Sequence, residues 1–278
     1  MWPLYVLVNK LLKLEEVDNE EPARGNFNLV ESYLFSLLLS KEKWDSETET
    51  TARSFEVPHI NQQHAWDCGL ACVLMVLRTL GIHSGDIQEL EELCCTTSIW
   101  TVDLAYLLQR FSVKFSYFTV TLGANPNFSV ETFYKDQLPN DVLRVDMLFK
   151  KARDTGINIE CRSFNGEELS SLILSGKYIA IALVDQYILS RSWLEDVCIS
   201  SIYRDNPGYT GHYIIICGYD CSTNEFEIRD PASSRKHERI PLRRLQEARK
   251  AFGTDEDLLV ISLEKIGNQT SPLLSLFP

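Results

Sequence analysis

The sequence has little positive charge and no long apolar run. Its 278 residues include 27 Lys and Arg against 39 Asp and Glu, a formal net charge of −12 at pH 7. Broad electrostatic binding to nucleic acid or to anionic membranes requires basic surface, so we expect no nucleic-acid partner. We also expect no integral membrane segment, because the apolar residues 1–14 are too few to span a bilayer.

A secretory signal is also missing from the printed sequence. Residues 1–14 lack a basic n-region and a small-residue cleavage site. Disulfide frameworks are typical of short secreted chains, whereas the eight cysteines of this longer chain are irregularly spaced. We therefore expect reduced thiols and a cytoplasmic location. Residues 1–14 fit a strand or helix that packs on the main domain, or a peripheral helix that binds a membrane or a partner.

Most of the negative charge lies near the start of the sequence. Residues 15–50 contain ten acidic and three basic side chains, which accounts for −7 of the total −12. Such a composition is typical of a linker. We predict an N-terminal apolar segment with an acidic linker (1–54), a main domain (55–265) and a C-terminal tail (266–278).

The main domain has helical patterns first and clusters its strand patterns late. Helices are predicted at residues 67–80, 86–94, 101–110, 141–154 and 165–174, the last with a capping box formed by Asn165 and Glu168. Strands are predicted at residues 55–60, 114–119, 178–184, 212–219, 225–229 and 258–263, with a hairpin turn at 220–224. This order indicates an α+β fold rather than alternating βαβ units.

Cys68 stands at the predicted start of a helix, where a thiol can act as a nucleophile. The unpaired N–H groups at a helix N-terminus favour negative charge and therefore the thiolate. Catalysis by a thiol also needs a base, a group that orients the base, and donors for the oxyanion. Gln62, upstream of Cys68, is placed to supply an amide donor.

His212 and Asp230 are the candidates for the base and for the group that orients it. His212 opens a predicted strand after Gly211, and Asp230 ends the neighbouring one, so antiparallel pairing can bring the two side chains together. Taken singly, each residue also fits a structural role: a buried helix cysteine, a core histidine or a turn-forming aspartate. Their joint order favours the catalytic interpretation. His64 is a competing base, close to the thiol but without an obvious carboxylate partner.

These residues resemble the papain-like leader-peptidase domain of bacteriocin-exporting transporters. The family pattern is Gln, then Asp-Cys-Gly, then a His that opens a strand, then Asp-Pro-Ala. It stands here as Gln62, Asp67-Cys68-Gly69, His212 and Asp230-Pro231-Ala232. The resemblance covers roughly residues 57–263. It implies a papain-like cysteine peptidase fold, with N-terminal helices packed on an antiparallel sheet, and a peptide or amide substrate.

A second, nearly full-length resemblance is to the plant guanylyl cyclase family. It is carried by residues 1–5 (MWPLY), 66–72 (WDCGLAC), 98–106 (SIWTVDLAY) and 252–257 (FGTDED). The resemblance implies a lyase that converts GTP to cyclic GMP, with magnesium as cofactor.

The residues alone do not explain cyclase chemistry. Cyclisation of a nucleoside triphosphate needs metal-holding carboxylates and cations near the departing pyrophosphate, and the sequence has no G-x-x-x-x-G-K-[ST] loop. Residues 98–110 fit a degenerate cyclase pattern loosely, which makes Ser98, Asp103 and Arg110 candidate nucleotide or magnesium ligands. A capped, packed helix explains the same stretch better.

One basic run remains to be assigned. It consists of Arg235, Lys236, His237, Arg239, Arg243 and Arg244. We predict a solvated helix face there, with triphosphate binding as the alternative.

Three functions therefore stay open. The first is a magnesium-dependent guanylyl cyclase acting on GTP, and the second is a thiol hydrolase acting on peptide or amide bonds without a cofactor. The third is a binding module that kept the constellation and lost the activity.

Overall fold

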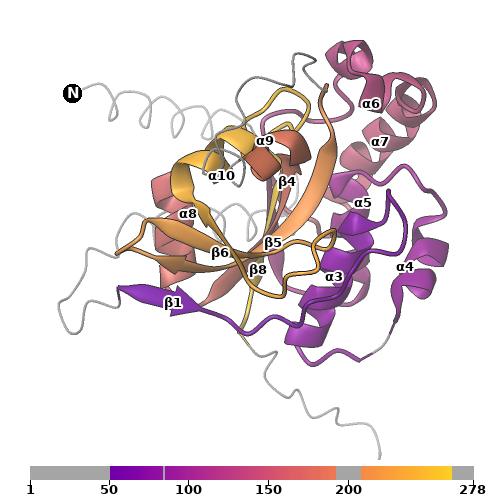
Figure 1. Cartoon of the computed structure of the whole chain (residues 1–278). Coiled ribbons are helices and arrows are strands. Elements are labelled where there is room, and N and C mark those ends of the chain that lie inside the picture. Colours follow the sequence, from indigo (N-terminus) through magenta and orange to yellow (C-terminus); the bar gives the residue numbers. More distant parts are fainter. Residues whose placement is uncertain (1–50, 84, 192–207, 265–278) are drawn as a thin grey trace, which may run out of the picture. The chain divides into compact units, whose positions relative to one another are not determined.

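A sheet of eight strands organises the computed structural model, which describes residues 51–83, 85–191 and 208–264 (Figure 1). The strand order is β3-β2-β8-β4-β5-β6-β7, and β1 pairs with β5 off this path. Only β2 and β3 run parallel among these strands. The strands are β1 (Ala52–Ser54), β2 (Phe115–Thr119), β3 (Ile159–Cys161), β4 (Tyr178–Asp185), β5 (Gly211–Asp220), β6 (Glu225–Arg229), β7 (Glu238–Pro241) and β8 (Leu258–Ser262).

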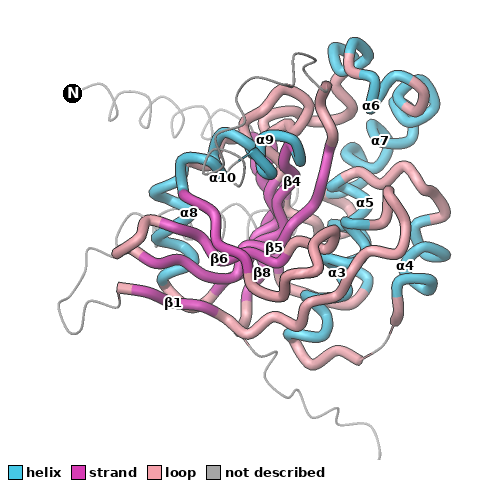
Figure 2. Tube along the Cα trace, in the orientation of Figure 1, coloured by secondary structure: helices cyan, strands magenta, loops and turns pink. Residues whose placement is uncertain are grey.

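Helices lie on both sides of this sheet (Figures 1 and 2). On one side are α3 (Cys68–Thr79), α4 (Ile87–Cys94), α5 (Thr101–Arg110), the 3-10 helix η1 (Pro126–Val130), α6 (Thr132–Lys135) and α7 (Leu138–Ala152). On the other are α8 (Gly166–Leu174), α9 (Gln186–Arg191) and α10 (Leu242–Arg249). Every residue of β4 after Tyr178 is buried, as expected for a strand covered on both faces.

The structure confirms the predicted α+β class, with early helices packed on a largely antiparallel sheet. The apolar helix α3 is buried along most of its length and packs against β5 and α5. The hairpin of β5 and β6 turns where it was predicted. Asn165 and Glu168 form the predicted capping box of α8, with bonds of 2.8 and 2.9 Å.

The strand predicted at residues 55–60 is wrong, because the paired segment is β1 just before it. The Phe55 N–H still donates to the Cys217 carbonyl at 2.8 Å. Beyond that point Pro58 has no N–H to donate, and the Val57 carbonyl accepts from Arg229 Nε at 3.0 Å. The segment is therefore fixed by a side chain rather than by a neighbouring strand.

Several predictions fall outside the described residues. These are the apolar segment 1–14, most of the acidic linker, the tail from residue 266, and Cys198. The predicted domain limits therefore stay a prediction. Among the described residues, seven cysteines are free thiols, and no helix is long and apolar enough to cross a membrane.

Candidate active site

Helix α3 places Cys68 at its first residue. The first N–H groups of an α-helix have no acceptor within the helix, so this end favours negative charge. Cys68 is 6% exposed and borders a pocket. The structure therefore puts the thiol at a helix end that favours negative charge and beside a pocket that a substrate can enter.

His212 and Asp230 meet across the hairpin of β5 and β6. His212 is the second residue of β5, and Asp230 directly follows β6. The His212 Nε2 lies 2.7 Å from the Asp230 Oδ1, and the two side chains are 3% and 13% exposed. The same oxygen accepts the N–H of Ala232 at 2.8 Å. The contact predicted to orient the base is present.

The charges of these groups are coupled to Cys68. Burial acts to lower the pKa of His212, but hydrogen bonds and negative charge from Asp230 and Cys68 raise it to about 9. Burial acts to raise the pKa of Asp230, while its bonds to His212 and Ala232 hold it below its ordinary value. Because Nε2 faces Asp230, Nδ1 is the ring nitrogen left for the thiol. The arrangement favours an imidazolium beside sulfur, which is the reactive state of a cysteine–histidine pair.

Gln62 lies in the loop before α3, and its Nε2 donates to the His64 carbonyl at 2.7 Å. Asp67, which is fully buried, holds this loop by accepting the N–H of Gln63 at 3.1 Å and that of His64 at 3.0 Å. The Gln62 N–H donates to the Pro231 carbonyl at 3.0 Å, which ties the loop to the turn after β6. The second N–H of the Gln62 amide is left for an oxyanion, a role that stays a prediction.

Two other histidines lie near these residues. The exposed His64 stacks on Trp66 with 5.8 Å between ring centroids, and no carboxylate pairs with its ring among the described contacts. His59, which sequence reasoning did not single out, has its Nε2 3.0 Å from the backbone carbonyl of Asp230. The geometry therefore favours His212 as the base.

A pocket of about 280 Å³ opens beside Cys68. Five aromatic residues line it, together with Asp255 and Asp257. The aromatic residues are Trp66, Trp100, Phe133, Tyr134 and Tyr213. From the sequence, Asp255 and Asp257 were named only as part of the guanylyl cyclase family segment 252–257. The signal that could have found them is their position directly before the apolar strand β8.

These two carboxyls have unusual surroundings. Burial, with the negative charge of Asp255, raises the pKa of Asp257 to about 8. The Tyr117 hydroxyl donates to the Asp257 Oδ2 at 3.0 Å. Burial raises the pKa of Asp255 to about 6, although hydrogen bonds from Thr121 and Asn125 act against this. At neutral pH, Asp255 is therefore mostly ionised and Asp257 mostly protonated.

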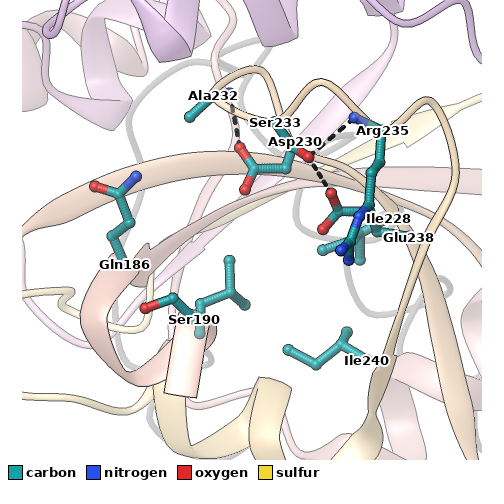
Figure 3. Close-up of a pocket in the computed structure, with 10 residues that line it drawn as sticks. Gln186, Ser190, Ile228, Asp230, Ala232, Ser233, Arg235, Glu238 and Ile240 are labelled. Atoms are coloured by element: carbon teal, nitrogen blue, oxygen red, sulfur yellow. Dashed lines mark hydrogen bonds between the residues drawn. The ribbon is translucent and has the colours of Figure 1, made fainter. Parts of the chain in front are cut away.

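A second pocket, of about 360 Å³, borders Asp230 (Figure 3). Gln186 and Ser190 of α9 line one side, and Arg235 and Glu238 lie across from them (Figure 3). Asp230 thus faces both the imidazole of the thiol site and this polar pocket.

Of the three weak nucleotide candidates, Ser98 and Asp103 are brought together and Arg110 is set apart. Arg144 donates to the Ser98 carbonyl at 2.9 Å and to Asp103. Ser98 lines the pocket beside Cys68, but Arg110 is exposed at the far end of α5, about 14 Å along the helix from its start. Asp103 caps α5 through the Trp100 N–H at 2.9 Å and pairs with Arg144 at 2.5 Å. Packing and capping therefore account for Asp103.

The basic run is not one helix face, so that prediction is wrong. It is divided between the loop before β7, β7 itself and α10, because residues 238–241 pair with β6. Several of these side chains have acidic partners: His237 with Glu227 at 2.9 Å and Arg239 with Asp220 at 3.3 Å. The run does not form a single phosphate-binding surface.

Residues 57–261 match a family model described as guanylylate cyclase. The chain is 56% identical over 271 residues to a protein of Arabidopsis thaliana named Guanylyl cyclase 1, a match that covers 97% of this chain and 99% of that protein.

The chain is also similar to solved structures of peptidases. A C39-like peptidase from Bacillus anthracis is 13% identical, with 74% of this chain and 94% of that chain covered and a TM-score of 0.42. Xylellain, a cysteine protease from Xylella fastidiosa, is 14% identical, with 77% and 86% covered and a TM-score of 0.43. Because both scores are below 0.5, the papain-like arrangement rests on the helix, hairpin and side-chain geometry given above.

Proposed function

Because the chain belongs to the guanylylate cyclase family, we propose that it is a guanylyl cyclase, a lyase that converts GTP to cyclic GMP and pyrophosphate. The observation that supports this is the likeness to the Arabidopsis relative over nearly the whole of both chains. The family model spans Cys68, His212, Asp230 and the pocket acids Asp255 and Asp257, so both the thiol site and the pocket lie inside the shared region.

Magnesium belongs to this proposal as the ion that accompanies GTP. Among the described residues, no group of three or more His, Cys, Asp or Glu side chains could hold a metal ion. Mg²⁺ is commonly bound by one or two carboxylates together with substrate phosphates and water, so it does not require a protein cage. The described side chains do not form a magnesium site by themselves, and no step is assigned to the ion.

A second candidate function, a thiol hydrolase, is favoured by the contacts of His212 with Asp230 and Cys68. In that reaction the Cys68 thiolate attacks the carbonyl carbon of an amide, and the His212 imidazolium protonates the departing amine. Water then attacks the thioester, giving a carboxylic acid and restoring the thiol. This route needs no cofactor.

One experiment separates the candidates. Purified protein is incubated with GTP, with and without magnesium, and cyclic GMP is identified by mass; amide hydrolysis is measured on a peptide library. Cys68→Ala is tested beside Cys221→Ala, which removes an exposed thiol in the β5–β6 turn.

We expect the native protein to form cyclic GMP in a magnesium-dependent reaction. Cyclic GMP at background level would overturn it. Peptide cleavage that is lost in Cys68→Ala and kept in Cys221→Ala would establish the hydrolase. If neither product forms, the remaining function is that of a binding module.

A further inference from the structure

The pocket beside Cys68 has a volume and aromatic lining residues that suit one ring system. Its volume of about 280 Å³ lies just below the range of roughly 300–1,000 Å³ that is typical of sites for whole small molecules. Five aromatic side chains line it, and Phe133 is 46% exposed, so its ring is accessible from solvent. Aromatic walls of this kind bind bases by stacking.

The charge of the pocket determines which end of a nucleotide can enter. No Lys, Arg or His is among the described residues that line it, whereas two carboxyls are. A triphosphate would meet the ionised Asp255 with no Lys or Arg in the described lining to compensate, so the interior disfavours it. The base of a nucleotide carries no such charge.

Asp255 is the side chain that can recognise the polar edge of a ligand in this pocket. It lines the pocket, is partly exposed, and is mostly ionised at neutral pH because its pKa is about 6. An ionised carboxylate only accepts hydrogen bonds, and its two oxygens suit a ligand edge with two adjacent N–H donors. Guanine presents such an edge at N1–H and the 2-amino group; adenine has an acceptor at N1.

Asp257 adds a polar atom without a described partner to the lining of the pocket. It is 6% exposed, and its Oδ1 has no hydrogen-bond partner among the described residues. The hydroxyls of Thr101 and Thr119 lie near enough to favour the ionised carboxyl, but without hydrogen-bond geometry to Oδ1. A buried polar atom without a partner is rare and costly, and a hydrogen bond with a ligand would relieve it.

We propose that this pocket binds the guanine base of GTP, with the N1–H and 2-amino groups donating to Asp255 and with the phosphates outside. The choice of GTP rests on the proposed cyclase function. The guanidinium of an arginine side chain presents the same pair of donors and would suit the hydrolase alternative, so it is a separate arm of the test.

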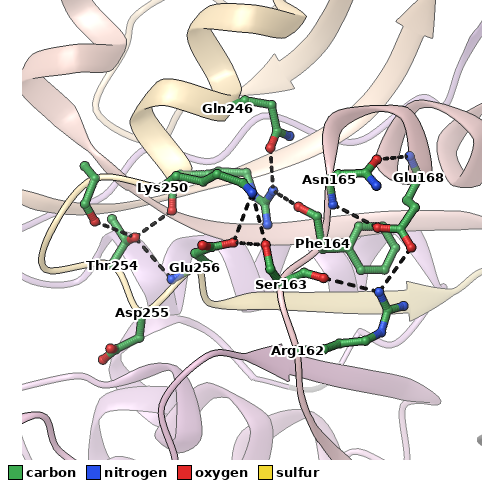
Figure 4. A network of polar contacts seen from close by, with 12 residues as sticks. Arg162, Ser163, Phe164, Asn165, Glu168, Gln246, Lys250, Thr254, Asp255 and Glu256 are labelled. Atoms are coloured by element: carbon green, nitrogen blue, oxygen red, sulfur yellow. Dashed lines mark hydrogen bonds and ion pairs between the residues drawn. The ribbon is translucent and has the colours of Figure 1, made fainter. Parts of the chain in front are cut away.

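The turn that holds Asp255 also provides a matched control. Glu256 faces away from the pocket: its Oε2 accepts from the Ser163 hydroxyl at 2.5 Å and lies 3.6 Å from the Lys250 Nζ (Figure 4). Figure 4 shows the Asp255 carboxyl turned away from that network. Asp255 has a left-handed φ of 47°, which asparagine adopts readily, so Asp255→Asn should fold.

The test is calorimetric titration of the full chain with guanosine, inosine, adenosine and N-acetylarginine amide, without magnesium, at neutral pH. We expect guanosine to bind more tightly than inosine, which lacks the 2-amino group, and adenosine to bind most weakly. Asp255→Asn should weaken guanosine binding about tenfold or more, while Glu256→Gln leaves it unchanged. Phe133→Leu, at the exposed edge of the pocket, should weaken all three nucleosides by removing a stacking surface.

Equal binding of adenosine and guanosine, or guanosine binding unaffected by Asp255→Asn, would overturn the proposal. So would binding of the arginine amide alone, which would assign the pocket to a peptide side chain. Cyclic GMP is measured on the same preparations. If cyclic GMP forms but guanosine binding does not depend on Asp255, the pocket assignment is overturned and the cyclase function stands. If guanosine binding depends on Asp255 but no cyclic GMP forms, the cyclase function is overturned and the pocket assignment stands.

Discussion

The Nε2–H of His212 donates to the Oδ1 of Asp230 across 2.7 Å, from the start of β5 to the turn after β6. Strand pairing and the turn after β6 bring these two residues together, although 17 residues separate them along the chain (213 to 229). The contact leaves Nδ1 for Cys68 and keeps a positive charge on the imidazole, because the pKa of His212 is raised to about 9. The reactivity of Cys68 should therefore depend on Asp230.

Asp230→Asn should slow the alkylation of Cys68 by iodoacetamide near neutral pH, by about tenfold. Removing the carboxylate lowers the pKa of His212, so less imidazolium is present to stabilise the thiolate. The rate is measured at Cys68 by peptide mass mapping. Asp220→Asn, the same substitution at the exposed end of β5, is the control and should react as the native protein does. Equal rates in both variants would show that Asp230 does not activate the thiol.

Local sequence signals located most of the elements around the thiol site. The apolar run of α3, the capping box of α8 and the turn between β5 and β6 each act within a few residues, so they can be identified without tertiary information. Hairpin pairing then places His212 beside Asp230.

The remaining features depend on contacts that sequence does not encode locally. The short strand β3 exists because it pairs in parallel with β2, and the segment after β1 is fixed by the Arg229 side chain. The burial of Asp257 could not be predicted, because acids in a glycine-containing loop are usually solvated.

Arg144 joins two buried acids and should be important for stability. Its guanidinium lies 2.5 Å from Asp103 and 3.1 Å from Asp141, and both acidic side chains are 7% exposed. Arg144→Met keeps the apolar stem but leaves two buried carboxylates without a cation, at a cost of about 3 kcal/mol in urea denaturation. Arg243→Met, at a 91% exposed arginine paired with Glu247, should change stability little. A small loss of stability in Arg144→Met would indicate that another cation lies at these acids. Asp103 would then again be a candidate magnesium ligand.

Asp67 should fix the loop that carries Gln62. Its buried carboxylate accepts backbone N–H groups from Gln63 and His64, and an asparagine would turn one donor toward them. We expect Asp67→Asn to lower the free energy of unfolding by about 1–3 kcal/mol. The comparison is Asp86→Asn, because Asp86 caps α4 through the Glu89 N–H at 2.8 Å and asparagine is an equally good N-cap. Similar, small losses in both variants would mean that Asp67 does not hold the loop.

Asp257→Asn should make stability less dependent on pH. An unfolded aspartate loses its proton near pH 4, whereas burial raises the pKa of Asp257 to about 8 in the folded chain. Between these values the folded state binds the extra proton, so the native protein loses stability as pH rises, by at most about 1.4 kcal/mol per pH unit from this group. Above about pH 8 both states are ionised, and this loss stops.

Asparagine has the same shape without the charge, and its carbonyl can accept the Tyr117 hydroxyl that now donates to Oδ2. The difference in unfolding free energy between Asp257→Asn and the native chain should therefore move in favour of the variant from about pH 5 to about pH 8 and then level off. His212 is present in both chains, so its own titration cancels in this difference. Urea denaturation across that range measures it, with Glu256→Gln as the reference for a neighbouring acid that pairs with Lys250. A difference that stays constant with pH would show that Asp257 ionises as an ordinary carboxyl does, and that the pocket beside Cys68 holds two negative charges at neutral pH.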